Sequence, residues 1–183
     1  MLDQSLKNIA IGNLETRMQY IEKCSFLNFE PITFTFDEIT AGIQTHNLKN
    51  LLSKTMGNNV NHPTIYRISV CDSAVASALY DKFLSIRFQN KDIKFPKINK
   101  NSVSTTIYVG SSISIVSRIK QHFYDAAKGT YALKMSRWNL TGSNQAKLEL
   151  TSDISSKKHF GFQDLEDALW QQSQPMFGKK GSH

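Results

Sequence analysis

The sequence has few cysteines and no long apolar run. Its two cysteines, Cys24 and Cys71, stand in unrelated surroundings, without a CxxC motif or a cysteine–histidine cluster. A structural zinc site needs about four such ligands at close spacing, so that class of site is excluded. No stretch approaches the roughly 20 apolar residues that span a bilayer, and the start lacks a basic segment followed by an apolar core. These absences predict a cytoplasmic protein with no membrane segment and two reduced thiols.

The charge of the chain is positive. Twenty-two lysines and arginines stand against 15 acidic residues, which gives a formal net charge of +7. Such a balance favours an anionic partner, nucleic acid first, although a lysine-rich surface without a partner gives the same count. A hydrophobic content of 40% over 183 residues supports a packed core and excludes disorder as the overall state.

The first 60 residues form a mostly helical region of unknown role. Apolar residues at helical spacing predict a helix over 3–25, and an alternating pattern predicts a strand over 29–36, with Pro31 at a sheet edge. Asp37 caps a further helix to about Leu52. The turn residues at 56–59 then mark a boundary. This region would support the core, contact substrate or mediate pairing. The apolar residues of the first helix are Leu6, Ile9, Leu14, Met18 and Ile21.

The first candidate site residue lies on a strand beyond this boundary. Tyr66 stands in an alternating segment over 64–70, and a helix follows over about 74–88. The next ten residues, 91–100, carry four lysines and are typical of an exposed basic loop. The loop is either simply solvated or a strip that contacts phosphates. Its lysines are Lys91, Lys94, Lys97 and Lys100.

The second tyrosine strand, over 105–109, ends at Gly110 and leads into an amphipathic helix. Arg118 and His122 are four residues apart there, so their side chains share one face at the edge of the apolar stripe. An arginine at such a position can make paired hydrogen bonds to a phosphate. The alternative is an ordinary solvated arginine beside a boundary histidine.

Glu166 belongs to a final helix that ends before Pro175. One carboxylate can hold a Mg²⁺ ion whose other ligands are water and phosphate oxygens. Acidic residues are equally favoured near a helix N-terminus by the helix dipole, so this pattern alone does not decide. The two strand tyrosines are likewise ambiguous, because a phenol is a poor base unless a cation lowers its pKa.

Taken together and in order, these motifs resemble the GIY-YIG endonuclease family. The resemblance runs over about residues 64–178 and rests on Thr64-Ile65-Tyr66, Tyr108-Val109-Gly110, the Arg118/His122 helix and the Glu166 helix. It implies an α/β (α+β) fold with a small three-stranded mixed or antiparallel sheet flanked by helices. The nuclease domain would occupy 61–183, with an insertion at about 71–104.

The resemblance also implies a function: hydrolysis of phosphodiester bonds in DNA with one Mg²⁺ (or Mn²⁺) ion per site. Glu166 would bind the metal, Arg118 would steady the scissile phosphate, and Tyr66 would act as the base. Tyr108 would position substrate or water, and His122 would assist. Gly110 and the four loop lysines would contact substrate. The enzyme would be of restriction, repair or mobile-element type, and a homodimer would supply two sites for double-strand cleavage.

The sequence departs from the family pattern at two auxiliary positions. Ser111 and Ser112 stand where some members have a lysine, and Gly178 stands where an asparagine is frequent. A second hypothesis follows, in which the fold is a catalytically weak or inactive module that binds nucleic acid. A third is an interaction protein whose basic surface binds an acidic partner.

Overall fold

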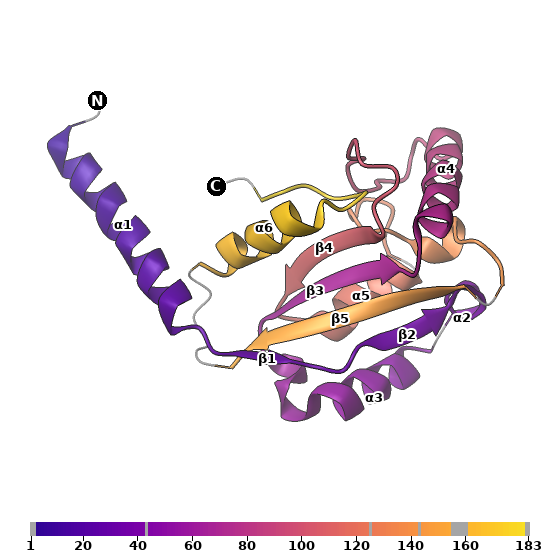
Figure 1. Cartoon of the computed structure of the whole chain (residues 1–183), viewed down its shortest axis with the longest axis horizontal. Coiled ribbons are helices and arrows are strands. Elements are labelled where there is room, and N and C mark those ends of the chain that lie inside the picture. Colours follow the sequence, from indigo (N-terminus) through magenta and orange to yellow (C-terminus); the bar gives the residue numbers. More distant parts are fainter. Residues whose placement is uncertain (1–2, 43, 125, 143, 155–160, 182–183) are drawn as a thin grey trace.

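The computed structural model describes residues 3–42, 44–124, 126–142, 144–154 and 161–181 (Figure 1). The helices within these ranges are α1 (Gln4–Lys23), α2 (Phe36–Ala41), α3 (Thr45–Met56), α4 (Ser73–Gln89), α5 (Ile115–Phe123) and α6 (Phe162–Ser173), with 3₁₀ turns η1 (Gly57–Asn61) and η2 (Met135–Arg137). The strands are β1 (Phe26–Asn28), β2 (Ile32–Thr35), β3 (Thr64–Val70), β4 (Thr106–Ser112) and β5 (Gln145–Asp153).

One antiparallel sheet organises the fold. Its strand order is β1-β5-β3-β4, and β2 also pairs with β5. The predicted fold class is confirmed, and the three expected strands are β3, β4 and β5. Of two further strands, β2 lies within the segment 29–36 where the sequence predicts a strand, whereas β1 precedes that segment and was not predicted. Pro31 lies between them and has no N–H to donate to a ladder.

The division at residue 60 stays a prediction, although residues from both sides of it share this sheet. Strand β5 pairs on one side with β3 and on the other with β1 and β2. The N-terminal region therefore supplies strands as well as helices to the same sheet.

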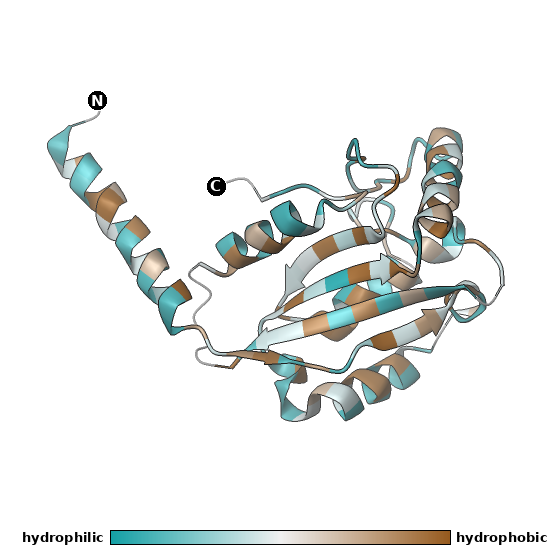
Figure 2. Cartoon of the chain, in the orientation of Figure 1, coloured by the Kyte–Doolittle hydropathy of each residue, from teal (hydrophilic) through white to brown (hydrophobic). Residues whose placement is uncertain are grey.

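The main core lies on one face of the sheet. Alternate residues of β3 and β5 point to this face, where α3, α4 and α5 cover them. Figure 2 shows the corresponding mixture of apolar and polar colours along the strands. The strand residues on the core face include Tyr66, Ile68, Leu148 and Leu150, all at most 2% exposed.

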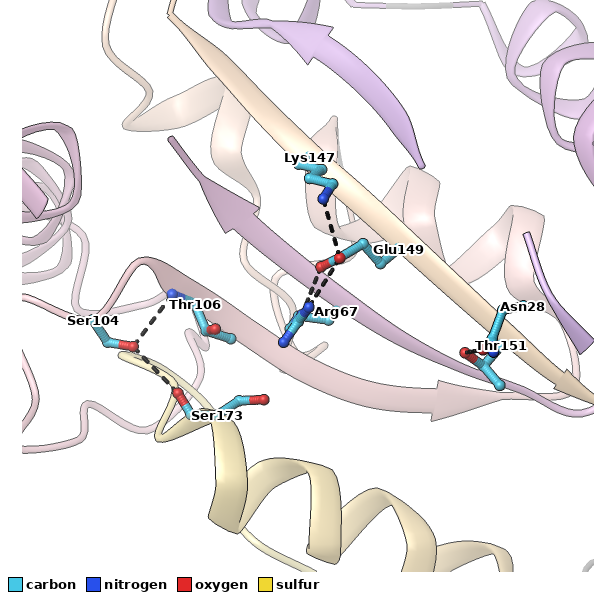
Figure 3. A network of polar contacts seen from close by, with 8 residues as sticks. All are labelled: Asn28, Arg67, Ser104, Thr106, Lys147, Glu149, Thr151 and Ser173. Atoms are coloured by element: carbon cyan, nitrogen blue, oxygen red, sulfur yellow. Dashed lines mark hydrogen bonds and ion pairs between the residues drawn. The ribbon is translucent and has the colours of Figure 1, made fainter. Parts of the chain in front are cut away.

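A charged pair on the opposite face helps to set the register of β3. Arg67 and Glu149 are direct cross-strand partners, and the Arg67 Nε lies 2.6 Å from a Glu149 carboxylate oxygen (Figure 3). Lys147 also contacts this carboxylate. A slip by one residue would place Arg67 in the core and turn Tyr66 outward, so the pairing also fixes the direction of the tyrosine.

The helix predicted from Asp37 to Leu52 is two helices. Gly42, with φ of +80°, follows α2 and breaks the path that an L-residue helix would continue. Thr35, not Asp37, caps α2: its hydroxyl accepts the Glu38 N–H, while the Glu38 carboxylate accepts the Thr35 N–H.

Helix α1 projects from the body of the molecule (Figure 1) and has no buried residue. The apolar stripe expected from its sequence is exposed, and Met18 is 60% accessible. Its last turns are attached by the ion pair between Arg17 and Asp164 and by a hydrogen bond from the Tyr20 hydroxyl to Asp153. In the described ranges no helix combines the length and the apolar character that a membrane crossing requires.

The segment between the two tyrosine strands consists of α4 and a loop that returns to the sheet. Residues 176–178 lie along the outer edge of β4, where the Met176 N–H donates to Thr106 and the Phe177 N–H donates to Ile107. Residues 97–99 then pair with this segment through Ile98 and Phe177. The loop therefore packs against the edge of the sheet next to the second tyrosine.

Candidate active site

Tyr66 and Tyr108 lie side by side on neighbouring strands. Tyr108 pairs with Ile68 across the β3–β4 ladder, two residues from Tyr66, so both rings occupy the core face. The rings are nearly parallel, with centroids 6.2 Å apart. Tyr66 is 1% exposed, whereas Tyr108 is only partly buried. The two strands therefore deliver two phenol groups to one place, one inside the core and one at its margin.

Gly110 makes room for this arrangement. It is the register partner of Tyr66, and a Cβ atom at position 110 would lie 2.5 Å from the Tyr66 hydroxyl oxygen and 2.8 Å from the Tyr108 ring. Real side chains do not approach so closely, and both neighbours are held by packing. The glycine of the second motif is thus explained by the space that the two tyrosines occupy.

Arg118 joins the two phenols. Its Nε donates to the Tyr66 oxygen at 3.2 Å, and its Nη2 lies 3.4 Å from the Tyr108 oxygen. Nη1 donates to the Gln121 side chain, and Nη2 is also 3.4 Å from the Tyr131 carbonyl oxygen. These contacts fix the guanidinium plane at the rim of the core and use four of its five N–H groups, so one N–H on Nη1 can be presented to a phosphate.

His122 is fully buried, and its tautomer follows from its contacts. The backbone N–H of Leu133 points at Nδ1 over 3.2 Å, and an amide N–H can only donate. Nδ1 therefore carries a lone pair, and the proton of the neutral ring is on Nε2. That nitrogen lies 2.9 Å from the Tyr66 oxygen. The Tyr66 oxygen thus accepts one N–H from His122 and one from Arg118.

Burial controls the protonation of this cluster. It raises the pKa of Tyr66, and the neighbouring Tyr108 raises it further, while Arg118 opposes both effects. Burial likewise raises the pKa of Tyr108 against the lowering effect of Arg118. Burial lowers the pKa of His122 well below its ordinary value, and the cations of Arg118 and Lys134 add to this. At neutral pH the cluster holds two phenols, a neutral imidazole and a guanidinium.

Glu166 approaches the cluster around the outer edge of β4. The Ser111 hydroxyl donates to its carboxylate at 2.5 Å, and Ser111 directly follows Gly110. Burial raises the pKa of this carboxyl group; the bond from Ser111 and the charge of Arg118 lower it. Arg118 and Glu166 also act on the Tyr108 phenol. Electrostatically, all of these groups belong to one site.

The carboxylate of Glu166 fits a Mg²⁺ ion. Within the described ranges no three His, Cys, Asp or Glu side chains converge into a cage. Mg²⁺ needs no such cage, because it retains water ligands and takes one or two carboxylates together with substrate phosphate. A half-buried carboxylate whose negative charge is disfavoured by burial would be stabilised by a divalent cation. The donor set therefore agrees with a single ion.

The four loop lysines do not form one strip. Lys91 lies over the ring of Phe88, and Lys94 lies over the ring of Tyr131, whose carbonyl contacts Arg118. Lys97 and Lys100 line a separate hollow of about 560 Å³ beside Trp170 and Gln174 of the last helical segment. Lys94 is therefore the loop lysine that the structure connects to the tyrosine and arginine cluster.

Sequence reasoning missed the groups that orient the site residues. In the sequence Ser111 stands out only as an absent lysine, yet it bonds Glu166. Gly178 stands out only as an absent asparagine, but its φ is +105° and a Cβ there would lie 3.0 Å from the Tyr108 ring. Leu133 orients His122 through its backbone, which no residue type in the sequence could indicate. For the contact between Arg118 and Gln121, the sequence did offer a signal, because residues three apart on a helix lie on the same face.

Comparison with known protein families matches residues 98–180 to the GIY-YIG catalytic domain. The matched range contains Tyr108, Arg118, His122 and Glu166, and it begins after Tyr66. The resemblance to the GIY-YIG endonucleases is thus confirmed over residues 98–180. No curated protein and no solved structure matches the chain. A GIY-YIG catalytic domain implies nuclease activity on DNA in general, and nucleases with this domain generally depend on a divalent metal ion.

Proposed function

We propose that the chain is an active, Mg²⁺-dependent (or Mn²⁺-dependent) endonuclease that hydrolyses phosphodiester bonds in DNA. The observation that supports this best is the guanidinium of Arg118, which contacts the hydroxyl groups of Tyr66 and Tyr108 together. Residues from two strands and a helix converge there, and Glu166 approaches from a second helix. The intact set of Tyr66, Tyr108, Arg118 and Glu166 favours an active enzyme over an inactive binding module.

In the proposed reaction, a water molecule attacks the phosphorus atom, the P–O bond to one ester oxygen breaks, and that oxygen leaves as an alcohol after taking a proton from solvent. Tyr66 takes the proton of the water, because its oxygen accepts N–H groups from His122 and Arg118 and these donors favour the phenolate form. Arg118 holds the phosphate and stabilises the charge that develops on its oxygens. Tyr108, at the margin of the core, positions the water or the substrate.

Glu166 is the proposed metal ligand, with one ion per site. A bound divalent cation supplies Lewis-acid stabilisation of the phosphate charge. Ser111 orients the carboxylate through its hydroxyl group, and burial excludes competing water from this side. These are the contributions of the chain itself: a fixed carboxylate, a fixed guanidinium and a phenol with two donors.

Supercoiled plasmid DNA incubated with the full chain tests the proposal. We expect nicking or linearisation with Mg²⁺ or Mn²⁺ and at least about a 10²-fold lower rate with excess EDTA. Binding without cleavage under all metal conditions would favour the inactive module. Neither binding nor cleavage would favour an interaction protein. The ratio of nicked to linear product also tests the predicted homodimer, because paired sites favour linear product.

Neutralising the basic loop is expected to weaken DNA binding across unrelated sequences. Replacing Lys91, Lys94, Lys97 and Lys100 with glutamine should reduce the slope of log affinity against log salt by about 0.9 for each phosphate that is no longer neutralised. Fluorescence anisotropy between ~50 and ~200 mM salt measures this slope. A charge-matched control replaces Lys7, Lys23, Lys49 and Lys54, which are exposed on α1 and α3. Equal slopes for the two variants would show that the loop lysines are solvated and do not contact DNA phosphates.

A further inference from the structure

Lys134 is a lysine in an unfavourable position. Its side chain is 0% exposed, and its backbone adopts the left-handed region with φ of +54°. A left-handed conformation is unfavourable for a non-glycine residue. An ammonium group inside a protein is also costly unless its N–H groups are satisfied. Contacts of the Lys134 side chain must therefore offset both the left-handed backbone and the buried charge.

The ammonium of Lys134 connects two loops. It donates to the carbonyl oxygen of Lys94 at 2.9 Å and to the carbonyl oxygen of Thr130, and it lies over the ring of Phe95. Lys94 belongs to the segment between the tyrosine strands, and Thr130 belongs to the turn after α5. The side chain therefore holds the 130–134 backbone against the 94–95 backbone from inside the protein.

The same turn supplies two backbone contacts to the active site. The Leu133 N–H points at Nδ1 of His122, and the Tyr131 carbonyl oxygen faces Nη2 of Arg118. The Trp138 indole N–H donates to the Leu133 carbonyl oxygen at 2.6 Å, so the next peptide, between Leu133 and Lys134, is held as well. Because Lys134 directly follows Leu133, anchoring its side chain restrains the backbone that carries this N–H.

His122 is faced by charged or titratable groups from each element around it. Tyr66 comes from β3, Tyr108 from β4 with its ring centroid 4.5 Å away, and Arg118 from the preceding turn of α5. Lys134 comes from the turn. Burial lowers the pKa of His122, and the two cations act in the same direction. Hydrogen bonds to the carbonyl oxygens of Lys94 and Thr130 hold the Lys134 ammonium at the turn. Its positive charge therefore acts on His122 from that side.

We propose that Lys134 is a positioning residue, which fixes the 130–134 turn so that His122 stays neutral with its proton on Nε2, directed at the Tyr66 oxygen. The catalytic consequence rests on the proposed function, whereas the effect on the His122 tautomer does not. Tyr66, the proposed base, would then depend on Lys134, because Lys134 keeps His122 in the tautomer that donates to the Tyr66 oxygen.

The test is long-range ¹H–¹⁵N NMR of the histidine rings in the full chain, recorded from about pH 5.5 to 8. We expect wild-type His122 to keep an unprotonated Nδ1 and a protonated Nε2 throughout. In Lys134→Met the ring should exchange between tautomers or titrate within this range, because the variant removes a cation and releases the fixed N–H. Lys128→Met is the matched control, since Lys128 is exposed and pairs with Asp92 in the same region.

Activity gives a second readout. Cleavage by Lys134→Met should fall at least about 10-fold below wild type, because a ring whose proton moves to Nδ1 no longer donates to the Tyr66 oxygen. Lys134→Arg keeps the charge and should restore part of the wild-type rate. If Lys134→Met does not fold, Lys134→Gln replaces it, because an amide can still donate to one carbonyl without the charge.

The outcomes separate the two proposals. A folded Lys134→Met or Lys134→Gln with wild-type His122 resonances at every pH would overturn the positioning role, whatever the cleavage rate. A changed His122 tautomer supports the positioning role even in a chain that cleaves no DNA, and in that case only the proposed function fails.

Discussion

Replacing Glu166 with glutamine is expected to lower DNA cleavage by at least about 10³-fold without lowering the thermal stability of the protein. Glutamine is nearly isosteric and still accepts the hydrogen bond from Ser111, so the fold should persist. It cannot supply the anionic oxygen that a Mg²⁺ site requires. Plasmid cleavage and thermal unfolding of the same preparation measure both effects.

The stability part follows from the sign of the pKa shift. The pKa of Glu166 is raised in the folded protein, mainly by burial. The folded state therefore binds the proton more tightly than the unfolded state, and this stabilisation is lost as pH rises through the folded pKa. At pH 7 the ionised carboxylate opposes folding, and glutamine removes that opposition. We expect an unfolding temperature at pH 7 equal to or above that of wild type, with a smaller difference near pH 4.

Asp164→Asn is the control on the same helix. Asp164 pairs with Arg17 of α1, outside the cluster of Tyr66, Tyr108 and Arg118. This variant should loosen α1 and retain cleavage. Cleavage by Glu166→Gln at the wild-type rate, with Asp164→Asn also active, would contradict the metal-ligand assignment.

Tyr66→Phe is expected to lower cleavage by about 10²–10⁴-fold, the range that general base catalysis contributes. Because the pKa of Tyr66 is raised by burial, only a small fraction is phenolate at neutral pH. The wild-type rate should therefore rise with pH toward the alkaline side, and Tyr66→Phe should lose this rise. Single-turnover cleavage of a labelled duplex between about pH 6 and 9 measures the slope.

Folding needs its own check for this variant, because Phe leaves the N–H groups of Arg118 and His122 without their shared acceptor. A buried donor without a partner costs about 1–3 kcal/mol, so denaturant unfolding should show a decrease in stability of that size. Tyr80→Phe, a tyrosine that stacks on Phe177 away from the cluster, is the control. A full wild-type rate in folded Tyr66→Phe would move the base role to another group, and Tyr108 is the next candidate.

The sequence predicted the parts of the site that depend on spacing within single elements. Four-residue spacing placed Arg118 and His122 on one face of α5, and alternation gave each tyrosine a defined face of its own strand, while the β3–β4 register brings Tyr66 and Tyr108 together. Their order along the chain then indicated the family, which the match over residues 98–180 confirms. These features are local, so the pattern of residue types is sufficient to find them.

The features that the sequence did not predict depend on contacts between distant segments. Nothing in the sequence around Lys134 indicates a buried lysine, and only the folded chain shows its ammonium between the carbonyls of Lys94 and Thr130. Exposure of α1 could not be predicted either, because an apolar stripe on a helix normally indicates a packed face. Burial of a lysine and exposure of a methionine both contradict residue preference, which is the basis of sequence prediction.

The loop that separates the two tyrosine strands also limits how this edge of the sheet can pair with another chain. The free edge of an exposed strand offers unpaired N–H and C=O groups to other chains. At β4 these groups bond residues 176–178, and residues 97–99 bond that segment in turn, with the Gly178 N–H donating to Lys97. The outermost backbone on this side carries Lys97 and lies next to Lys100, and like-charged lysines repel a second copy. The insertion between the two tyrosine motifs thus covers part of the edge of the sheet beside the active site.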